Sequence, residues 1–144
     1  MVELDQVKPY QHKAQYYETD QMGCVHHSNY IRWFEEARTD LLEQVGFSYG
    51  RMEELGIMSP VLEVHAEYKS MVRYQEVVNI TSKVTYFNGL KFTISYVIED
   101  ALTKEIKTIG ESKHCFLNKD LKPMRLQKEN IEVYELFLQL ASQH

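Results

Sequence analysis

The hydrophobic pattern of this chain changes its period once, near Gly56, and this change restricts the folds that the chain can adopt. Before Gly56, between Tyr30 and Val45, apolar residues recur every three or four positions, which predicts an amphipathic α-helix. After it, apolar and polar residues alternate in successive segments, and such alternation is typical of half-buried antiparallel strands. The pattern therefore predicts an α+β layer fold, with one long helix on an antiparallel sheet.

The predicted long helix has a single apolar face, formed by Tyr30, Trp33, Phe34, Ala37, Leu41 and Val45. Ser28 or Asn29 can cap its N-terminus, and Gly46 is well placed to end it. A short second helix is expected at about 49–55. Because two large aromatic side chains lie on the apolar face, we expect the long helix to be substantially covered.

The strands are expected at about 12–17, 62–69, 78–86, 92–98 and 106–117. Asn88-Gly89 favours a two-residue hairpin turn, and the slipped alternation at Ile109-Gly110 suggests a β-bulge. The last four strands would form a meander, followed by a terminal helix at about 128–142 with apolar residues over most of its girth. Such a helix needs more cover than one sheet face provides.

Length and composition favour one intracellular domain, covering 1–144. A chain of 144 residues can bury a core without disulfides or metal ions. The net charge of −5 argues against nucleic-acid binding by the chain as a whole. No apolar run approaches the roughly 18 residues of a membrane-spanning helix, and residues 1–10 contain no signal-peptide core. With two cysteines, Cys24 and Cys115, free thiols and a cytoplasmic location are expected.

Reactive side chains are concentrated immediately before the long helix, at Asp20, Cys24, His26 and His27. A helix N-terminus presents unpaired N–H groups and a positive dipole end, which can stabilise an oxyanion. A nearby carboxylate can act as a nucleophile or as a base for water. The arrangement indicates acyl transfer or hydrolysis.

Each of these residues also has a simpler interpretation. Asp20, close to Gly23, suits a turn, and Cys24 suits a small buried apolar position. A metal site built from Asp20, His26 and His27 has no spaced ligand pattern behind it, so no metal is predicted.

Residues 17–38 read YETDQMGCVHHSNYIRWFEEAR. This segment resembles the signature of the hotdog-fold acyl-CoA thioesterases, and in particular the 4-hydroxybenzoyl-CoA thioesterase-like group. In that signature, a Thr-Asp-x-x-Gly loop precedes a His-x-Asn-Tyr helix start and a Glu-x-Ala-Arg turn. Residues 68–76 and 122–126 resemble later segments of the family, so the resemblance extends over roughly 8–128.

The resemblance implies a hotdog fold, in which a five-stranded antiparallel sheet wraps a long central helix, here followed by a C-terminal helix. It also implies a homodimer with two sites at its interface, and in some members a tetramer. By position, Asp20 matches the catalytic carboxylate and His27 the motif histidine. The backbone N–H groups of Val25, His26 and His27 fall where the family polarises the thioester carbonyl.

Four positions depart from the family pattern: Cys24, His26, Met71 and Gln75 stand where a branched aliphatic, an aromatic, a proline and an aspartate are common. Because none of them is the catalytic acid, the expected reaction is unchanged. The departures leave the acyl preference and the local strand geometry open.

The predicted function is therefore hydrolysis of an acyl-CoA thioester to a carboxylic acid and free CoA, with no metal or cofactor. The phosphates of CoA require local positive charge in an acidic protein, and Lys69, Arg73 and Arg125 are the candidates. Three alternatives remain: a non-catalytic acyl-CoA or acyl-carrier binding module, a thioesterase for acyl-carrier-protein substrates, and a thiol enzyme using Cys24 with His27.

Overall fold

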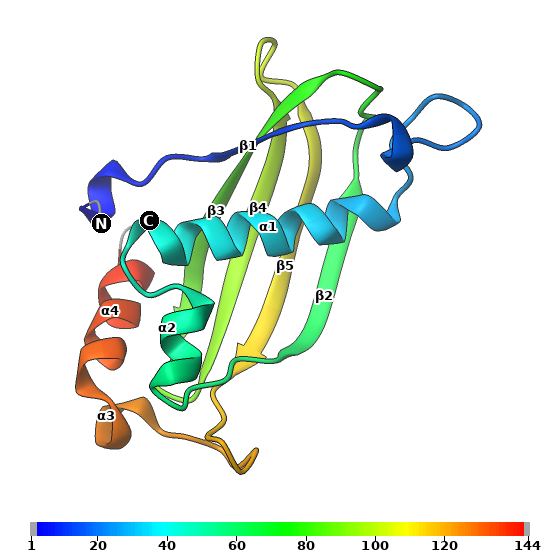
Figure 1. Cartoon of the computed structure of the whole chain (residues 1–144). Coiled ribbons are helices and arrows are strands. Elements are labelled where there is room, and N and C mark those ends of the chain that lie inside the picture. The colour runs from blue at the N-terminus through cyan, green and yellow to red at the C-terminus, as the bar shows by residue number, and fades with distance from the viewer. Residues whose placement is uncertain (1–2, 143–144) are drawn as a thin grey trace.

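The computed structural model describes residues 3–142 and contains a five-stranded antiparallel sheet with a long helix across one face. Its elements, with 3-10 turns written η, are η1 (Leu4–Gln6), β1 (Tyr10–Lys13), η2 (Tyr16–Glu18), α1 (Ser28–Gln44), α2 (Tyr49–Glu54), β2 (Val61–Tyr68), β3 (Val77–Phe87), β4 (Lys91–Asp100), β5 (Ile106–Cys115), α3 (Leu126–Glu129) and α4 (Ile131–Ala141). Both α1 and α4 pack on β3 (Figure 1). The predicted α+β fold with a central helix is confirmed.

The predicted apolar face of α1 is buried: Tyr30, Trp33, Phe34, Ala37, Leu41 and the C-capping Val45 are all in the core. Phe34 stacks on Tyr96 of β4, with ring centroids 4.4 Å apart and planes 8° apart. Gly46 follows the helix with φ of 89°, a conformation that side chains with a Cβ rarely adopt. The predicted helix and its glycine stop are confirmed, although the helix begins two residues earlier than expected.

The strand order is β1-β3-β4-β5-β2. Strands β3, β4 and β5 form the predicted meander, but β2 pairs with β5 at one edge and β1 pairs with β3 at the other. The predicted four-stranded meander is therefore wrong. Residues 69–76 carry the chain from one edge of the sheet towards the other instead of folding β2 back beside β3.

The β3–β4 hairpin lies where Asn88-Gly89 predicts it, but its turn is different. The connection comprises residues 88–90, and a positive φ occurs at Gly89 and not at Asn88. The side chain of Asn88 accepts hydrogen bonds from the N–H groups of Leu90 and Lys91. Asparagine thus closes the turn through its side chain rather than by adopting the left-handed conformation of a two-residue turn.

The predicted bulge at Ile109-Gly110 is absent from the β4–β5 pairing, where Gly110 lies opposite Tyr96 in regular register. The irregularity falls between Ile98 and Glu99 instead. A Cβ on Gly110 would lie 2.7 Å from the ring of Phe34 and 2.5 Å from the carbonyl oxygen of His65. The glycine therefore lets α1 approach the sheet.

Two other boundaries differ from the prediction. The first strand ends at Lys13, because its pairing with β3 ends there and the chain then forms the turn η2. The terminal helix is split at Asn130, whose φ of −155° is not helical and whose side chain caps α4 by accepting from the N–H of Val133. Among the described residues, none of the helices has both the length and the apolar composition that a bilayer crossing requires.

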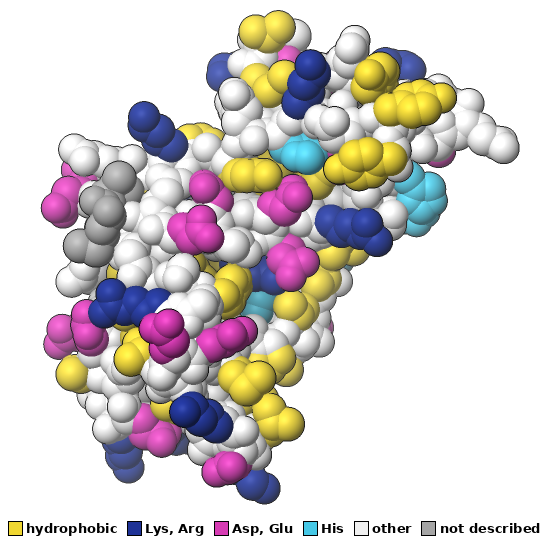
Figure 2. Space-filling model, viewed as in Figure 1, with side chains coloured by type: hydrophobic (Ala, Val, Ile, Leu, Met, Phe, Trp, Pro, Cys, Tyr) yellow, Lys and Arg dark blue, Asp and Glu magenta, His cyan; other side chains and the backbone are white. Residues whose placement is uncertain are grey.

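Strand β2 is exposed on both of its faces in the single chain, except at Ala66, so its predicted half-burial is not met within one copy. Together with neighbouring residues it forms an exposed strip, the β2 apolar band: Ile31, Met58, Val61, Leu62, Val64 and Tyr68. Figure 2 shows hydrophobic side chains gathered diagonally along this edge of the molecule. Such a strip, beside an unpaired strand edge, is typical of a surface that another chain covers.

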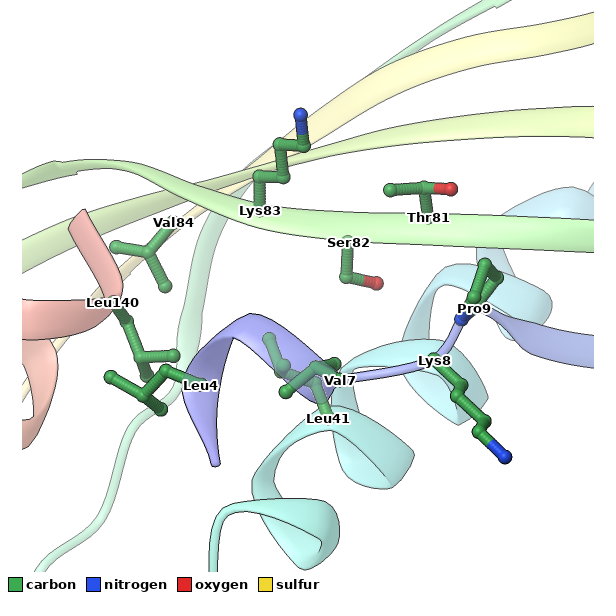
Figure 3. A pocket seen from close by; sticks show the side chains of 10 residues that line it. All are labelled: Leu4, Val7, Lys8, Pro9, Leu41, Thr81, Ser82, Lys83, Val84 and Leu140. Atoms are coloured by element: carbon green, nitrogen blue, oxygen red, sulfur yellow. The ribbon is translucent and has the colours of Figure 1, made fainter. Parts of the chain in front are cut away.

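A hollow of about 150 Å³ lies on the other side of α1, between η1, β3 and α4 (Figure 3). Its walls are largely apolar and include Leu4, Leu41 and Leu140. Ser82 points into it, whereas Lys83 points away. The hydroxyl of Ser82 is buried without a hydrogen-bond partner in the described chain. This hollow contains none of the predicted site residues.

Candidate active site

The loop before α1 is closed by its own backbone. The N–H of Asp20 donates to the carbonyl of Cys24, and the N–H of Gly23 donates to the carbonyl of Asp20. Gly23 has φ of 79°, which explains the glycine at this position. The predicted turn is therefore present, and it orients the carboxylate of Asp20.

Asp20 uses one carboxylate oxygen in this turn and leaves the other free. Its Oδ1 accepts from the N–H of Met22 at 2.8 Å and from that of Cys24 at 3.3 Å. Within residues 3–142, Oδ2 has no hydrogen-bond partner. The side chain of Asp20 can therefore close the turn through one oxygen and still present the other for reaction.

Two of the three predicted oxyanion donors are engaged elsewhere. The N–H of Val25 donates to the carbonyl of Val72 at 2.7 Å, and that of His26 donates to the carbonyl of Glu18 at 2.8 Å. The N–H of His27 has no partner in the described part of the chain. Of the three predicted donors, the described structure therefore leaves only the N–H of His27 available, because loop packing, which the sequence does not reveal, occupies the other two.

His27 is the N-cap of α1, and neither Ser28 nor Asn29 takes that position. His27 is exposed, and its ring stacks on that of His26 with centroids 4.3 Å apart. The side chain of Asn29 instead donates to the carbonyl of Glu18. No hydrogen bond joins His27 to Asp20 among the described residues.

The predicted catalytic pair shares one pocket of about 410 Å³. Asp20 and His27 line it from the loop and from the start of α1, and Lys69 lines it from the segment after β2. The remaining walls are Cys24, Val25, Tyr30, Tyr68, Ser70 and Met71. Tyr30 and Tyr68 are not among the predicted site residues, although the helical and strand periodicities place them on the inner faces of their elements.

Glu18 anchors this loop and was not predicted. Its buried carboxylate accepts from the ring of His12 at 2.9 Å, the N–H of Gln15 at 2.8 Å and the indole of Trp33 at 2.7 Å. Burial acts to raise the pKa of Glu18, but these hydrogen bonds outweigh it and hold the pKa below its ordinary value. The only sequence feature that could have pointed to Glu18 is its position, as an acidic residue two places before Asp20.

Cys24 is buried, with 4% of its surface exposed. Its Sγ lies 3.2 Å from Sδ of Met71 and 3.7 Å from Nη1 of Arg73. No hydrogen bond to His27 is present in the part of the chain that the structure describes. These contacts favour a packing role, as its apolar neighbours in the sequence suggest.

The three predicted CoA-binding residues do not converge within one chain. Lys69 lines the pocket and pairs with Glu67 at 3.1 Å. Arg73 does not line the pocket, but its Nη1 contacts Sγ of Cys24, which does. Arg125 lies at the start of α3, where the next residue binds Gly89 of the β3–β4 hairpin. That hairpin is at the opposite end of the sheet from the loop (Figure 1).

The structure also bears on the alternative of a metal site. Among residues 3–142, no three His, Cys, Asp or Glu side chains converge where a metal ion could be held. Asp20 and His27 line the pocket, whereas the ring of His26 is hydrogen-bonded to Ser28 at 2.9 Å.

The geometry can be compared with known proteins. The sequence matches the thioesterase-like superfamily over residues 15–133. The DHNA-CoA thioesterase structure from Staphylococcus aureus is 34% identical, with a TM-score of 0.85 over 92% of this chain and 89% of that one. YneP of Bacillus subtilis, provisionally named an acyl-CoA thioesterase, is 35% identical over 81% of this chain and 84% of its own.

A more distant relative is the acyl-CoA thioester hydrolase YbgC of Escherichia coli, which is 23% identical over 85% of this chain and 92% of its own. The match to the superfamily covers the candidate loop, α1 and all strands from β2 to β5. This chain therefore belongs to the thioesterase-like superfamily of hotdog-fold thioester hydrolases.

Proposed function

We propose that the chain hydrolyses acyl-CoA thioesters, R–CO–S–CoA plus water giving R–COOH and free CoA, at the pocket shared by Asp20 and His27. One observation carries the proposal: Asp20, whose Oδ2 has no hydrogen-bond partner among the described residues, and His27, the N-cap of a 17-residue helix, line the same cavity. A carboxylate beside an oxyanion donor is what hydrolysis of an activated acyl group requires.

In this mechanism, the N–H of His27 and the positive end of α1 stabilise the oxyanion that forms as the thioester carbonyl is attacked. Asp20 either deprotonates the attacking water, or attacks the carbonyl itself to form an acyl-aspartate anhydride that water then hydrolyses to R–COOH and the free carboxylate. In both routes the C–S bond breaks, and the departing thiolate takes up a proton to give free CoA. We assign the imidazole of His27 to orienting the substrate rather than Asp20, because it makes no hydrogen bond to Asp20 within the described residues. The proposed reaction uses no metal and no cofactor.

We assign Lys69 and Arg73 to the phosphates of CoA and omit Arg125 from the site of the same chain. Lys69 lines the pocket and Arg73 adjoins it, which supports this choice. Salt weakens exposed charge interactions beyond about 8–10 Å, so binding should depend on ionic strength.

We also propose that the chain is a single domain that acts as a homodimer, with tetramers as a further assembly. The exposed edge of β2 and the β2 apolar band support a second copy at this edge. Its two free cysteines support a cytoplasmic location.

The test is a panel of short-chain, long-chain and aromatic acyl-CoAs, with free thiol release as the readout. An aromatic acyl-CoA belongs in the panel because the name of the Staphylococcus relative specifies DHNA-CoA. Parallel acyl-carrier-protein substrates distinguish the carrier-protein alternative, and binding without thiol release would identify a non-catalytic module. Absence of thiol release from every substrate would contradict the proposal.

A further inference from the structure

A second hollow, of about 150 Å³, lies in the gap between α1 and β2 and contains a buried cation. Its apolar walls are Ile31 and Phe34 from α1 and Val61 and Val64 from β2, and we call it the α1–β2 groove. Arg38 and Ser112 contribute its buried polar groups. Arg38 has only 7% of its surface exposed, which is unusual for an arginine.

The guanidinium of Arg38 is incompletely satisfied. Its Nε donates to the hydroxyl of Tyr49 at 2.8 Å, and its Nη1 donates to that of Tyr96 at 3.1 Å. In residues 3–142, Nη2 makes no hydrogen bond. Among the described residues, the fully enclosed side-chain N and O atoms without a partner are Ser82 Oγ and Thr108 Oγ1, so Nη2 is not completely enclosed. Arg38 lines the groove, where a ligand atom can approach this nitrogen.

The groups that hold Arg38 are neutral. Tyr96 is 2.6 Å from Ser112, which is 2.7 Å from the ring of His114. Because Tyr96 accepts from Arg38, its own proton is available to Ser112, and Ser112 can in turn donate to His114. No carboxylate lies within 4.0 Å of Arg38 among the described residues, so its charge is not neutralised. A buried, unpaired charge is costly and marks a place where a ligand can supply the missing partner.

The groove lies next to the proposed active site, in the same gap. Tyr68 lines the pocket of Asp20, and Val64 is on the same face of β2 four residues earlier. Ile31 of the groove follows His27 by one helical turn. From His27 to Arg38 the helix rises by roughly 16 Å, and arginine side chains on a helix lean back towards its N-terminus.

Resting on the proposed function, we propose that Arg38 is a specificity-determining residue that binds an oxygen acceptor at the far end of the acyl group. With its thioester carbonyl at His27, an acyl group of suitable length passes along the apolar walls and ends at the free N–H groups of Arg38. The preferred substrates are acyl-CoAs with a distal carboxylate or hydroxyl. An apolar body with one polar end matches apolar walls with one buried cation.

The charges at the rim are mixed, because Arg32 and Glu35 also line the groove. Glu35 is not within 4.0 Å of Arg38 in the described structure. It is nevertheless an acid that lines the same groove, at the i−3 position of the same helix, and competes with a ligand for Arg38. Glu35→Gln should therefore strengthen binding of an anionic acyl group.

The experiment compares matched substrates that differ only at the far end: octanoyl-CoA with octanedioyl-CoA, and naphthoyl-CoA with a hydroxynaphthoyl-CoA. The measured quantity is the ratio of kcat/KM within each pair. In Arg38→Gln we expect the polar-to-apolar ratio to fall about 10- to 100-fold, the range for losing a charged hydrogen bond. The pair that responds identifies whether the acceptor is a carboxylate or a hydroxyl.

Two control variants accompany Arg38→Gln. Lys122→Gln removes the same charge from an exposed position that does not line the groove, and it should leave both ratios unchanged. Arg38→Lys keeps the charge but loses the planar fork, and it should retain part of the preference. Equal losses for the polar and apolar members of each pair would show a structural role and overturn the proposal.

The remaining outcomes are also decisive. If the wild-type enzyme hydrolyses no member of the panel, the proposed function fails, whereas unchanged ratios in an active Arg38→Gln overturn the role of Arg38 alone. If Arg38→Gln instead weakens self-association with unchanged ratios, Arg38 contacts a second copy and the proposal is wrong. Should the variant not fold, competitive inhibition of the wild type decides: octanedioate must inhibit at least 10-fold more strongly than octanoate, or for a hydroxyl acceptor hydroxynaphthoate more strongly than naphthoate.

Discussion

At the scale of single residues, the geometry of Asp20 agrees with both interpretations of its sequence position, as a turn residue and as a reactive carboxylate. Aspartate near glycine commonly forms a turn, and here Oδ1 does so through the N–H groups of Met22 and Cys24. The same bonds hold the carboxylate in one orientation and leave Oδ2 without a partner in residues 3–142. The turn therefore prepares Asp20 for the proposed chemistry.

Replacing Asp20 with Asn keeps the shape and removes the base. We expect kcat to fall about 10²- to 10⁴-fold, the usual contribution of a positioned base, with KM nearly unchanged. Steady-state kinetics measure both constants, while circular dichroism and melting temperature verify folding. His27→Ala should lose less, because its backbone N–H remains. A folded Asp20→Asn that keeps more than about a third of kcat contradicts the mechanism.

Cys24→Ala should retain most of the activity, because Cys24 Sγ packs against Met71 and Arg73 rather than pairing with His27. The same assays compare it directly with Asp20→Asn. Loss of activity in Cys24→Ala, with activity preserved in Asp20→Asn, would favour the thiol enzyme instead.

The charges assigned to CoA can be tested separately from the chemistry. Combined Lys69→Ala and Arg73→Ala should raise KM several-fold and weaken its dependence on salt, with kcat changed little because the phosphates lie far from the reacting carbonyl. Arg125→Ala, at the far end of the sheet, is the control for a lost positive charge. Kinetics at low and high ionic strength measure the effect, and an unchanged KM would remove both residues from the site.

At the scale of elements, the contact between α1 and the sheet depends on a missing side chain. Gly110 leaves room for Phe34, and a Cβ there would collide with the ring and with the carbonyl oxygen of His65. The carbonyl is backbone and cannot rotate away. We expect Gly110→Ala to destabilise the fold by about 1–3 kcal/mol, the usual cost of overpacking.

Gly50→Ala is the matched control, because a Cβ at Gly50 meets no atom closer than 3.9 Å and the residue lies in helix α2. It should be neutral or stabilising by up to about 1 kcal/mol. Urea unfolding of both variants measures the difference in the free energy of unfolding. Equal effects of the two substitutions would contradict the close approach of α1.

At the scale of the whole molecule, the exposed β2 edge predicts self-association. Light scattering should give at least twice the mass of 17.1 kDa. Val64→Lys on the inner face of β2 should shift the protein towards monomer, because a charge enters the β2 apolar band. Gln11→Lys, exposed on the opposite edge strand, should not. A wild-type monomer at micromolar concentration would refute the dimer.

The stability of the molecule should also depend on His114. Burial, reinforced by the charge of Arg38, lowers its pKa from 6.5 to about 4. As pH falls from 6.5 to 4, the unfolded chain binds a proton that the folded chain does not, so folding is weakened by up to about 3 kcal/mol. Urea unfolding across this range measures it, and His114→Gln should flatten the profile. Identical profiles would contradict a buried neutral His114.

The sequence alone determined the local features of this protein. Helix α1 with its buried face, the stop at Gly46, and the existence of the strands follow from periodicity and from residue types that act on their immediate neighbours. The loop motif around Asp20 likewise identified the family and the candidate carboxylate. These signals depend on residues a few positions apart, so they can be read without the fold.

Only the tertiary structure decided the features that join distant segments. The pairing of β2 with β5, the bond from Val25 to Val72, the burial of Arg38 and the distance of Arg125 from the loop all depend on contacts between residues far apart in the chain. Residue types and spacing in one sequence do not specify which strand becomes a neighbour or which carbonyl takes an N–H. Those choices are made by the packing of the whole molecule.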